Sequence, residues 1–280
     1  RKPPLGDEPV ERNIVLAYVG AEGYYPDERF IIDEWRTWAK KGANLSWRPN
    51  VLHAGHGMPY LFSRQLDEDF KVFMENNLLG TDFDSLVGNW GGQGPIYYVL
   101  AERHNRPDEP YETLIDEYYG AFGPAKEEMK AYFETFEKHT LKGPNLIRDN
   151  QLAPSETWGG WWKAFIRIVP LYFTPEVCKE GEALLQKARE KLEGADEVYR
   201  KRFEMVERNF RHSVLMAETF RKLHLHQPDT KTNFQAARET LKPLLELRKE
   251  MLVDLSTPVI RLINQEQRQL GIWNAFLSGP

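Results

Sequence analysis

Three short β-like runs decide the fold: NIVLAYVG at residues 13–20, NLSWRPNVLH at 44–53 and GTDFDSLV at 80–87. Two segments between these runs, residues 28–41 and 63–77, carry apolar side chains at helical spacing. Strands that alternate with helices of ten or more residues indicate parallel pairing. The sequence therefore predicts an α/β unit with a parallel sheet in the N-terminal half of the chain.

The C-terminal half has a helical and strongly charged pattern. It opens on Thr174-Pro175-Glu176, where Thr is a favourable N-cap and Pro a favourable first helical residue. In residues 140–173, glycines and prolines interrupt any helical or strand periodicity, and three tryptophans make the segment more apolar. This pattern is typical of an ordered but irregular connection. Antiparallel helices of this kind form bundles. The predicted helices span residues 174–194, 195–224 and 232–255.

The complete fold prediction is α/β followed by all-α, with the C-terminal portion of a (β/α)8 TIM-like barrel leading into a helical bundle. Such a barrel needs eight strands, and the sequence offers three. Either five strands precede this chain, or the unit is not a barrel. The opening Arg1-Lys2-Pro3-Pro4 resembles the inside of a longer protein and favours the first alternative. The predicted units are residues 1–140 (barrel), 141–173 (connection) and 174–280 (bundle).

Composition narrows the class of protein. The 37 basic and 42 acidic residues are interspersed and give a net charge of −5, so a nucleic-acid partner is not expected. The single cysteine, Cys178, excludes an internal disulfide and a cysteine-ligated metal site. No apolar run approaches the roughly 20 residues that cross a bilayer, so no membrane partner is expected. No cofactor motif is found, and the eight tryptophans favour a ring-shaped ligand such as a sugar.

Carboxylates at the strand ends are the candidate catalytic residues. Asp82 and Asp84 alternate along the third run, so their side chains are expected on one side of it. Glycosidases place two carboxyls about 5 Å apart when they retain configuration and roughly 6.5–9.5 Å apart when they invert it. Two residues of one strand lie too close for that arrangement, so at most one of them is catalytic, and Glu22 is the best partner within the chain. Alternatively, all three carboxylates have structural roles.

Trp90 is the best candidate for stacking on a sugar. It lies with Asn89 in a glycine-rich segment, residues 88–94, that does not look like core sequence. The apolar face of a pyranose packs against an aromatic ring. The same segment lacks the spacing of a dinucleotide-binding fingerprint.

The loop after the second run supplies further candidate contacts to substrate. His53 and His56 are expected to hydrogen-bond sugar hydroxyls, because a third metal ligand is absent and no metal site is predicted. Arg48 is expected to pair with a strand-end carboxylate or to contact substrate. Trp47 is a core residue or a second stacking surface. Structural roles for all four residues remain the alternative.

Several motifs in residues 13–137 resemble one family. They include the helix Tyr97–Arg103 and the pairing of Tyr118-Tyr119-Gly120 with a downstream Gly123-Pro124-Ala125, which is the most specific element. Together they resemble the bacterial family grouped under the domain of unknown function DUF4838. The other matching motifs are Trp35-Arg36-Thr37-Trp38, Trp47-Arg48-Pro49-Asn50, the run that starts at Gly80, and Asp116-Glu117.

The resemblance implies a secreted or periplasmic protein whose barrel is similar to those of α-glucuronidases or hexosaminidases and begins upstream of this chain. It implies a glycoside hydrolase-like function on polysaccharides or glycans. Many relatives have a glutamate where this chain has Asp84-Ser85, and a carboxylate set back by about 1 Å can lose on the order of 10²-fold in rate. The alternative is therefore a non-catalytic carbohydrate-binding or scaffold protein. The oligomeric state stays open.

Overall fold

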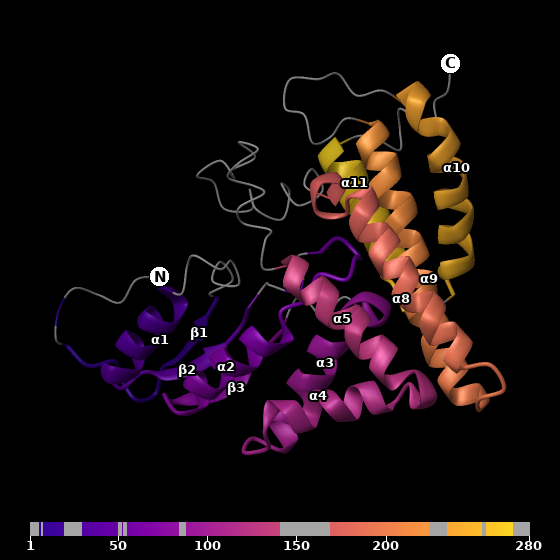
Figure 1. The fold of residues 1–280 in the computed structure, drawn as a ribbon. Coiled ribbons are helices and arrows are strands. Elements are labelled where there is room, and N and C mark those ends of the chain that lie inside the picture. Colours follow the sequence, from indigo (N-terminus) through magenta and orange to yellow (C-terminus); the bar gives the residue numbers. More distant parts are fainter. Residues whose placement is uncertain are drawn as a thin grey trace.

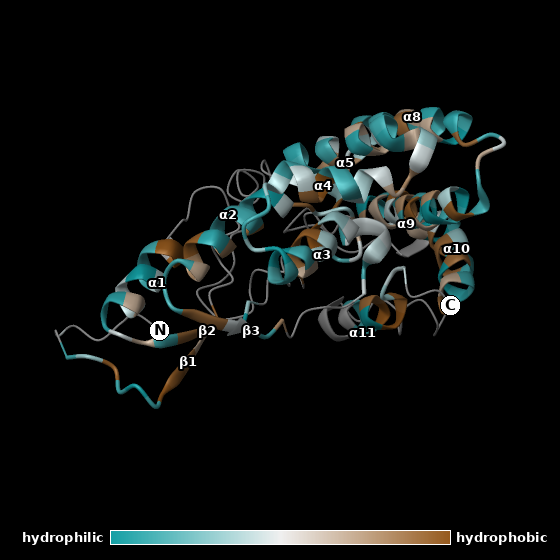
Figure 2. Ribbon diagram, turned by 90° about the horizontal axis from the view of Figure 1, so that it is seen from below, coloured by the Kyte–Doolittle hydropathy of each residue, from teal (hydrophilic) through white to brown (hydrophobic). Residues whose placement is uncertain are grey.

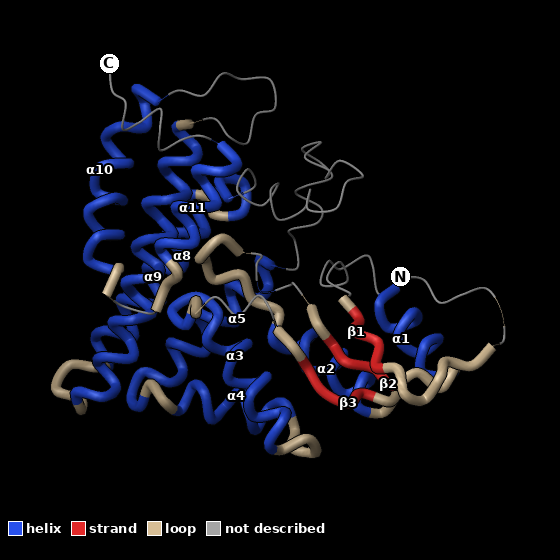
Figure 3. The backbone as a smooth tube through the Cα atoms, turned by 180° about the vertical axis from the view of Figure 1, so that it is seen from behind, coloured by secondary structure: helices blue, strands red, loops and turns tan. Residues whose placement is uncertain are grey.

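A computed structural model describes residues 6, 8–19, 30–49, 52, 55–83, 88–140, 169–223, 234–253 and 256–270. Within these ranges the strands lie together at one end of the molecule and helices make up the rest (Figure 3). The predicted division at residues 140 and 174 stays a prediction. The predicted connection falls largely outside the described residues.

The sheet contains three parallel strands within the described ranges, in the order β1-β2-β3. They are β1 (Val15–Tyr18), β2 (Asn44–Trp47) and β3 (Leu78–Thr81). Tyr18 lies opposite Trp47, and Trp47 lies opposite Thr81. The predicted parallel pairing is confirmed, although each strand is only four residues long.

Two helices, α1 (Phe30–Lys40) and α2 (Ser63–Met74), pack against the sheet (Figure 1). Aromatic rings fill the space between them. The Trp35 ring lies 4.2 Å from that of Phe73, and the Phe73 ring lies 4.8 Å from that of Trp47. Both tryptophans are fully buried, so this aromatic layer anchors the helices to the strands.

The prediction of a (β/α)8 TIM-like barrel is wrong. In the part of the chain that the structure describes, the sheet has three strands and does not close on itself. Strand–helix alternation specifies parallel pairing, but closure also requires eight strands with consistent tilt and stagger. Here the chain leaves the sheet after β3 and continues as helices that pack on one another.

Helices α3 (Trp90–Asn105), α4 (Tyr111–Gly120) and α5 (Lys126–Thr140) connect the sheet with the bundle. A short 3-10 turn, Gly123–Ala125, precedes α5. The predicted helices are present; α3 is kinked at Gln93, whose φ and ψ of −120° and 15° are not helical, so a short helical turn from Trp90 precedes the predicted helix from Gly94. Their common core is rich in aromatic rings: Tyr97, Tyr111, Tyr118, Tyr119, Phe122, Tyr132, Phe133 and Phe136.

The helical unit consists of α8 (Pro175–Lys191), α9 (Glu197–Lys222), α10 (Phe234–Met251) and α11 (Val259–Leu270). Helices α8, α9 and α10 run side by side in Figure 1. The Thr174 hydroxyl accepts a hydrogen bond from the Val177 amide at 3.3 Å, which confirms the predicted start signal. Helix α11 lies within the range predicted for the bundle, residues 174–280, but it is not among the three helices predicted there.

The hydropathy of the residues differs between the strands and the outer helix of the bundle. Strands β1 and β2 are brown and the outer helix α8 is largely teal in Figure 2. Among the described helices, none has the length and apolar character required to span a bilayer.

Candidate functional site

The carboxyl ends of the parallel strands bring two predicted residues together. The Arg48 amide donates to the Tyr18 carbonyl at 2.8 Å, and the Asp82 amide donates to the Trp47 carbonyl at 2.9 Å. This pairing holds the residues that follow β2 and β3 at one edge of the sheet. There Arg48 Nε donates to Asp82 Oδ2 at 3.2 Å, so Arg48 pairs with a strand-end carboxylate as expected. The Asp82 side chain is 67 % exposed and faces solvent at this edge.

Trp90 follows the same edge, at the first residue of α3. Its side chain is 44 % exposed, and the edge of its ring packs against Tyr97 with the centroids 4.9 Å apart and the planes at 75°. The next residue, Gly91, donates its amide to the Ser256 carbonyl at 2.8 Å. The backbone next to Trp90 is therefore bonded to the turn before α11, and part of the indole surface is exposed.

Asn89 is buried and its amide group contacts other parts of the protein. Its Nδ2 donates to the Met58 carbonyl at 3.3 Å, and its Oδ1 accepts from Asn209 Nδ2 at 3.1 Å. Asn209, on α9, also donates to the Gly57 carbonyl at 2.9 Å. Asn89 thus joins the loops after β2 and β3 to the helical unit, which makes it a supporting residue of the site.

His56 is also buried, with 5 % of its surface exposed. Its Nε2 donates to Glu266 Oε1 at 2.8 Å, a contact between the loop after β2 and α11. The φ angle of His56 is +46°, and its neighbours Gly55 and Gly57 have φ angles of +96° and +80°. Positive φ is uncommon for a residue other than glycine, so contacts of the His56 side chain help to hold this conformation.

Glu266 lies at the centre of a charged network inside the helical unit. Both of its oxygens accept from Arg248, at 2.8 Å each, and Arg248 Nε donates to His212 Nε2 at 3.0 Å. Burial raises the pKa of Glu266. The charge and hydrogen bonds of Arg248, together with the bond from His56, outweigh this effect and lower the pKa to about 2. Burial and the Arg248 charge hold the pKa of His212 well below its usual range. The network therefore contains an ionised Glu266 and a neutral His212.

Trp47 is fully buried, and its ring lies 5.3 Å from that of Phe83 and 5.9 Å from that of Phe70. This position favours the core interpretation of Trp47 over contact with a sugar. Three of the predicted site residues lie outside the described residues: Glu22, His53 and Asp84.

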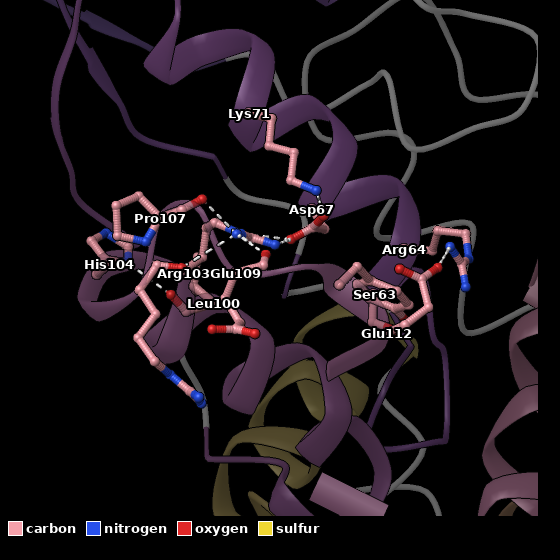
Figure 4. A network of polar contacts seen from close by, with 12 residues as sticks. Ser63, Arg64, Asp67, Lys71, Leu100, Arg103, His104, Pro107, Glu109 and Glu112 are labelled. Carbon is pink, nitrogen blue, oxygen red and sulfur yellow. Dashed lines mark hydrogen bonds and ion pairs between the residues drawn. The ribbon is translucent and has the colours of Figure 1, made fainter. Parts of the chain in front are cut away.

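A second buried ion pair lies between α2 and α3 (Figure 4). Arg103 donates to Asp67 Oδ1 at 2.7 Å and to the carbonyls of Pro107 and Glu109 at 2.6 and 2.7 Å. Lys71 reaches the other Asp67 oxygen at 3.0 Å. Arg103 is 1 % exposed, so its role is to fix the turn after α3 rather than to meet a ligand.

The sequence patterns do not single out Asn209, His212, Arg248 or Glu266. Asn209 and His212 fall among the apolar positions of α9, beside Val206 and Phe210. A polar residue at such a position indicates a buried polar contact. No pattern pairs Asn209 with Asn89 or Gly57, which lie 120 and 152 positions earlier. Among the described residues, no group of three or more His, Cys, Asp or Glu side chains is arranged to hold a metal ion.

No family model matches the chain, and searches of curated proteins and of solved structures return no significant match. The candidate site therefore rests on its own geometry. It comprises the exposed Trp90 ring and the Arg48–Asp82 pair at the carboxyl edge of the sheet. The buried contacts of Asn89 and His56 hold the loops that carry these residues.

Proposed function

We propose that this chain binds glycans at the loops that follow its parallel strands. The observation that carries the proposal is the exposed ring of Trp90. It is the one large aromatic side chain among the described residues that stands out as exposed, at 44 %. Rings held in this way stack on the apolar faces of pyranoses, and ligands of open parallel sheets bind beyond the carboxyl ends of the strands.

Polar groups at the carboxyl ends of the strands support the proposal. Arg48 and Asp82 form an ion pair at the strand ends, and charged or amide groups at such an edge can bind sugar hydroxyls. The resemblance to DUF4838 points in the same direction, toward polysaccharide degradation outside the cytoplasm. We infer a carbohydrate-binding role for the chain as its primary function.

Glycoside hydrolase-like activity is the second candidate. Asp82 favours it, because an exposed carboxylate at the carboxyl end of a strand could reach a bound sugar. Hydrolysis would require a second carboxyl roughly 5 to 9.5 Å away. Glu22 and Asp84 are the proposed partners.

A binding screen tests the first candidate. The 280-residue chain is run in native gels that contain polygalacturonate, soluble xylan or a chitin-derived oligosaccharide conjugate, which represent acidic, neutral and amino sugars. We expect retardation in at least one gel and its loss in Trp90→Ala. The substitution should weaken the binding free energy by about 1–3 kcal/mol, by analogy with stacking on aromatic residues elsewhere.

Leu79→Ala is the matched control, since Leu79 is an apolar residue 63 % exposed on β3. It should leave retardation unchanged. Equal retardation of the native chain and of Trp90→Ala would refute the proposal. Release of reducing sugar that disappears in Asp82→Asn, Asp84→Asn or Glu22→Gln would instead establish hydrolysis.

A further inference from the structure

Residues 256–266, which comprise the turn after α10 and the first two turns of α11, contact both loops of the proposed site. The Ser256 carbonyl accepts from the Gly91 amide at 2.8 Å, directly beside Trp90. Ten residues later, Glu266 accepts from His56 in the loop after β2 at 2.8 Å. One short segment of the helical unit therefore holds two loops that are separated by β3 and α2.

Side-chain packing strengthens the contact with the loop after β2. A Cβ atom on Gly57 would lie 2.6 Å from Leu262 Cδ1, so α11 lies directly against the loop backbone. Leu262 is 2 % exposed. A larger residue at position 57 would require the Leu262 side chain to shift, and the φ of +80° at this position also favours glycine.

The loop after β2 depends on this contact for its shape. Gly55, His56 and Gly57 are three successive residues with positive φ, and the histidine side chain disfavours that conformation. The His56–Glu266 bond compensates for the strain. Arg248 in turn fixes Glu266 through two hydrogen bonds, so the orientation of the carboxylate is set from α10.

We propose that residues 256–266 act as a clamp that holds the loops after β2 and β3 together and thereby controls ligand binding at Trp90. When the clamp is docked, the start of α3 is fixed and the Trp90 ring is presented to the ligand. When α11 separates from the loop, His56 leaves its strained conformation and the Gly91 amide loses its acceptor. By reciprocity, a glycan bound at Trp90 favours the docked clamp. The link to glycans rests on the proposed function.

Hydrogen exchange of the free chain tests the clamp without any ligand. His56→Gly removes the bond to Glu266 and also removes the strain, because glycine adopts positive φ freely. We expect the amides of residues 262–266 and of Gly91 to exchange at least tenfold faster than in the native chain. Faster exchange confined to residues 55–58 would overturn the proposal.

Asn77→Gly is the matched control. Asn77 is the other non-glycine residue with positive φ among those described, at +64°, and its side chain bonds Ala39 and Ala43 rather than the clamp. Exchange at residues 262–266 should stay at the native rate in this variant. An equal increase in both glycine variants would show general loosening and would overturn the proposal.

Leu262→Ala approaches the clamp from α11 and keeps the proposal testable if His56→Gly fails to fold. It should accelerate exchange of the Met58 and Gly91 amides together, whereas acceleration within α11 alone would count against a clamp. A final arm adds polygalacturonate, xylan or the chitin-derived conjugate, whichever retards the native chain, and expects slower exchange at residues 262–266. If no glycan is bound, the proposed function fails while the exchange results still decide the clamp.

Discussion

Arg103 shows at the scale of one residue how this fold uses buried charge. Its guanidinium meets Asp67 on α2 and three carbonyls of the turn after α3, those of Arg106, Pro107 and Glu109. A planar group with five donors suits this arrangement, and a lysine ammonium does not. The sequence shows an ordinary charged helix end at this point, so the buried ion pair could not be predicted from it.

Arg103→Ala should lower the free energy of unfolding by about 3–5 kcal/mol, because it leaves Asp67 in a buried site with Lys71 as its remaining partner. Arg103→Lys should recover less than half of the loss. Urea denaturation measures both effects. The control is Lys201→Ala, which removes an exposed pair with Glu197 and should cost less than about 1 kcal/mol. A loss below 1 kcal/mol for Arg103→Ala would contradict this account.

His212 predicts a pH effect. Its pKa in the folded chain lies well below its ordinary value of 6.5, because burial and Arg248 oppose the charged form. The unfolded chain therefore takes up a proton as the pH falls through 6.5, and the folded chain does not. The free energy of unfolding should fall by about 1.4 kcal/mol for each pH unit below 6.5 through this group.

His212→Gln keeps an acceptor for Arg248 and removes the titration. Comparison of the two chains between pH 7.5 and 5 isolates the contribution of His212, since the other titratable groups are shared. The native chain should lose more stability than the variant over this range. Parallel curves would rule out a neutral, buried His212.

At the scale of elements, the glycine-rich start of α3 is the most instructive difference between prediction and structure. Residues 88–94 resemble a ligand loop in sequence, yet Gly91, Gly92 and Gly94 are buried on either side of a kink at Gln93 near the start of α3. A Cβ atom on Gly91 would lie 2.6 Å from Asn209 Cβ, and one on Gly94 would overlap the Tyr118 hydroxyl. These glycines serve close packing, and Trp90 alone of this run faces solvent.

Gly91→Ala should therefore destabilise the chain by about 1–3 kcal/mol, because the added methyl group must push α9 away from α3. Gly120→Ala is the matched control, since no atom lies within 4 Å of the corresponding Cβ position at the end of α4. Thermal unfolding of both variants provides the comparison. Equal melting temperatures would show that α3 and α9 can adjust without cost.

At the scale of the whole molecule, local sequence patterns predicted local structure correctly, but they did not predict contacts between residues that lie far apart in the sequence. Parallel pairing, the helices of the sheet and the Thr174 start signal follow from spacing and capping within a few residues. Closure of a barrel depends on strand number and stagger, which three runs do not specify. The pairing of His56 with Glu266 spans 210 positions, and nothing near either residue announces it. Trp90 and Asp82 were selected from the sequence and are exposed, and their role in binding stays a prediction. Asn89 and His56 were also selected, but their buried partners Asn209 and Glu266 were not.

The exposed ring of Trp90 carries the account, so the most direct test observes that ring. The eight indole N–H groups give separate NMR signals in a chain labelled at tryptophan, and Trp90→Phe identifies the signal of Trp90. Titration with a polysaccharide that retards the chain should shift the Trp90 signal and leave those of the buried Trp35 and Trp47 unchanged. A titration in which the polysaccharide binds and the Trp90 signal stays unchanged would contradict the account.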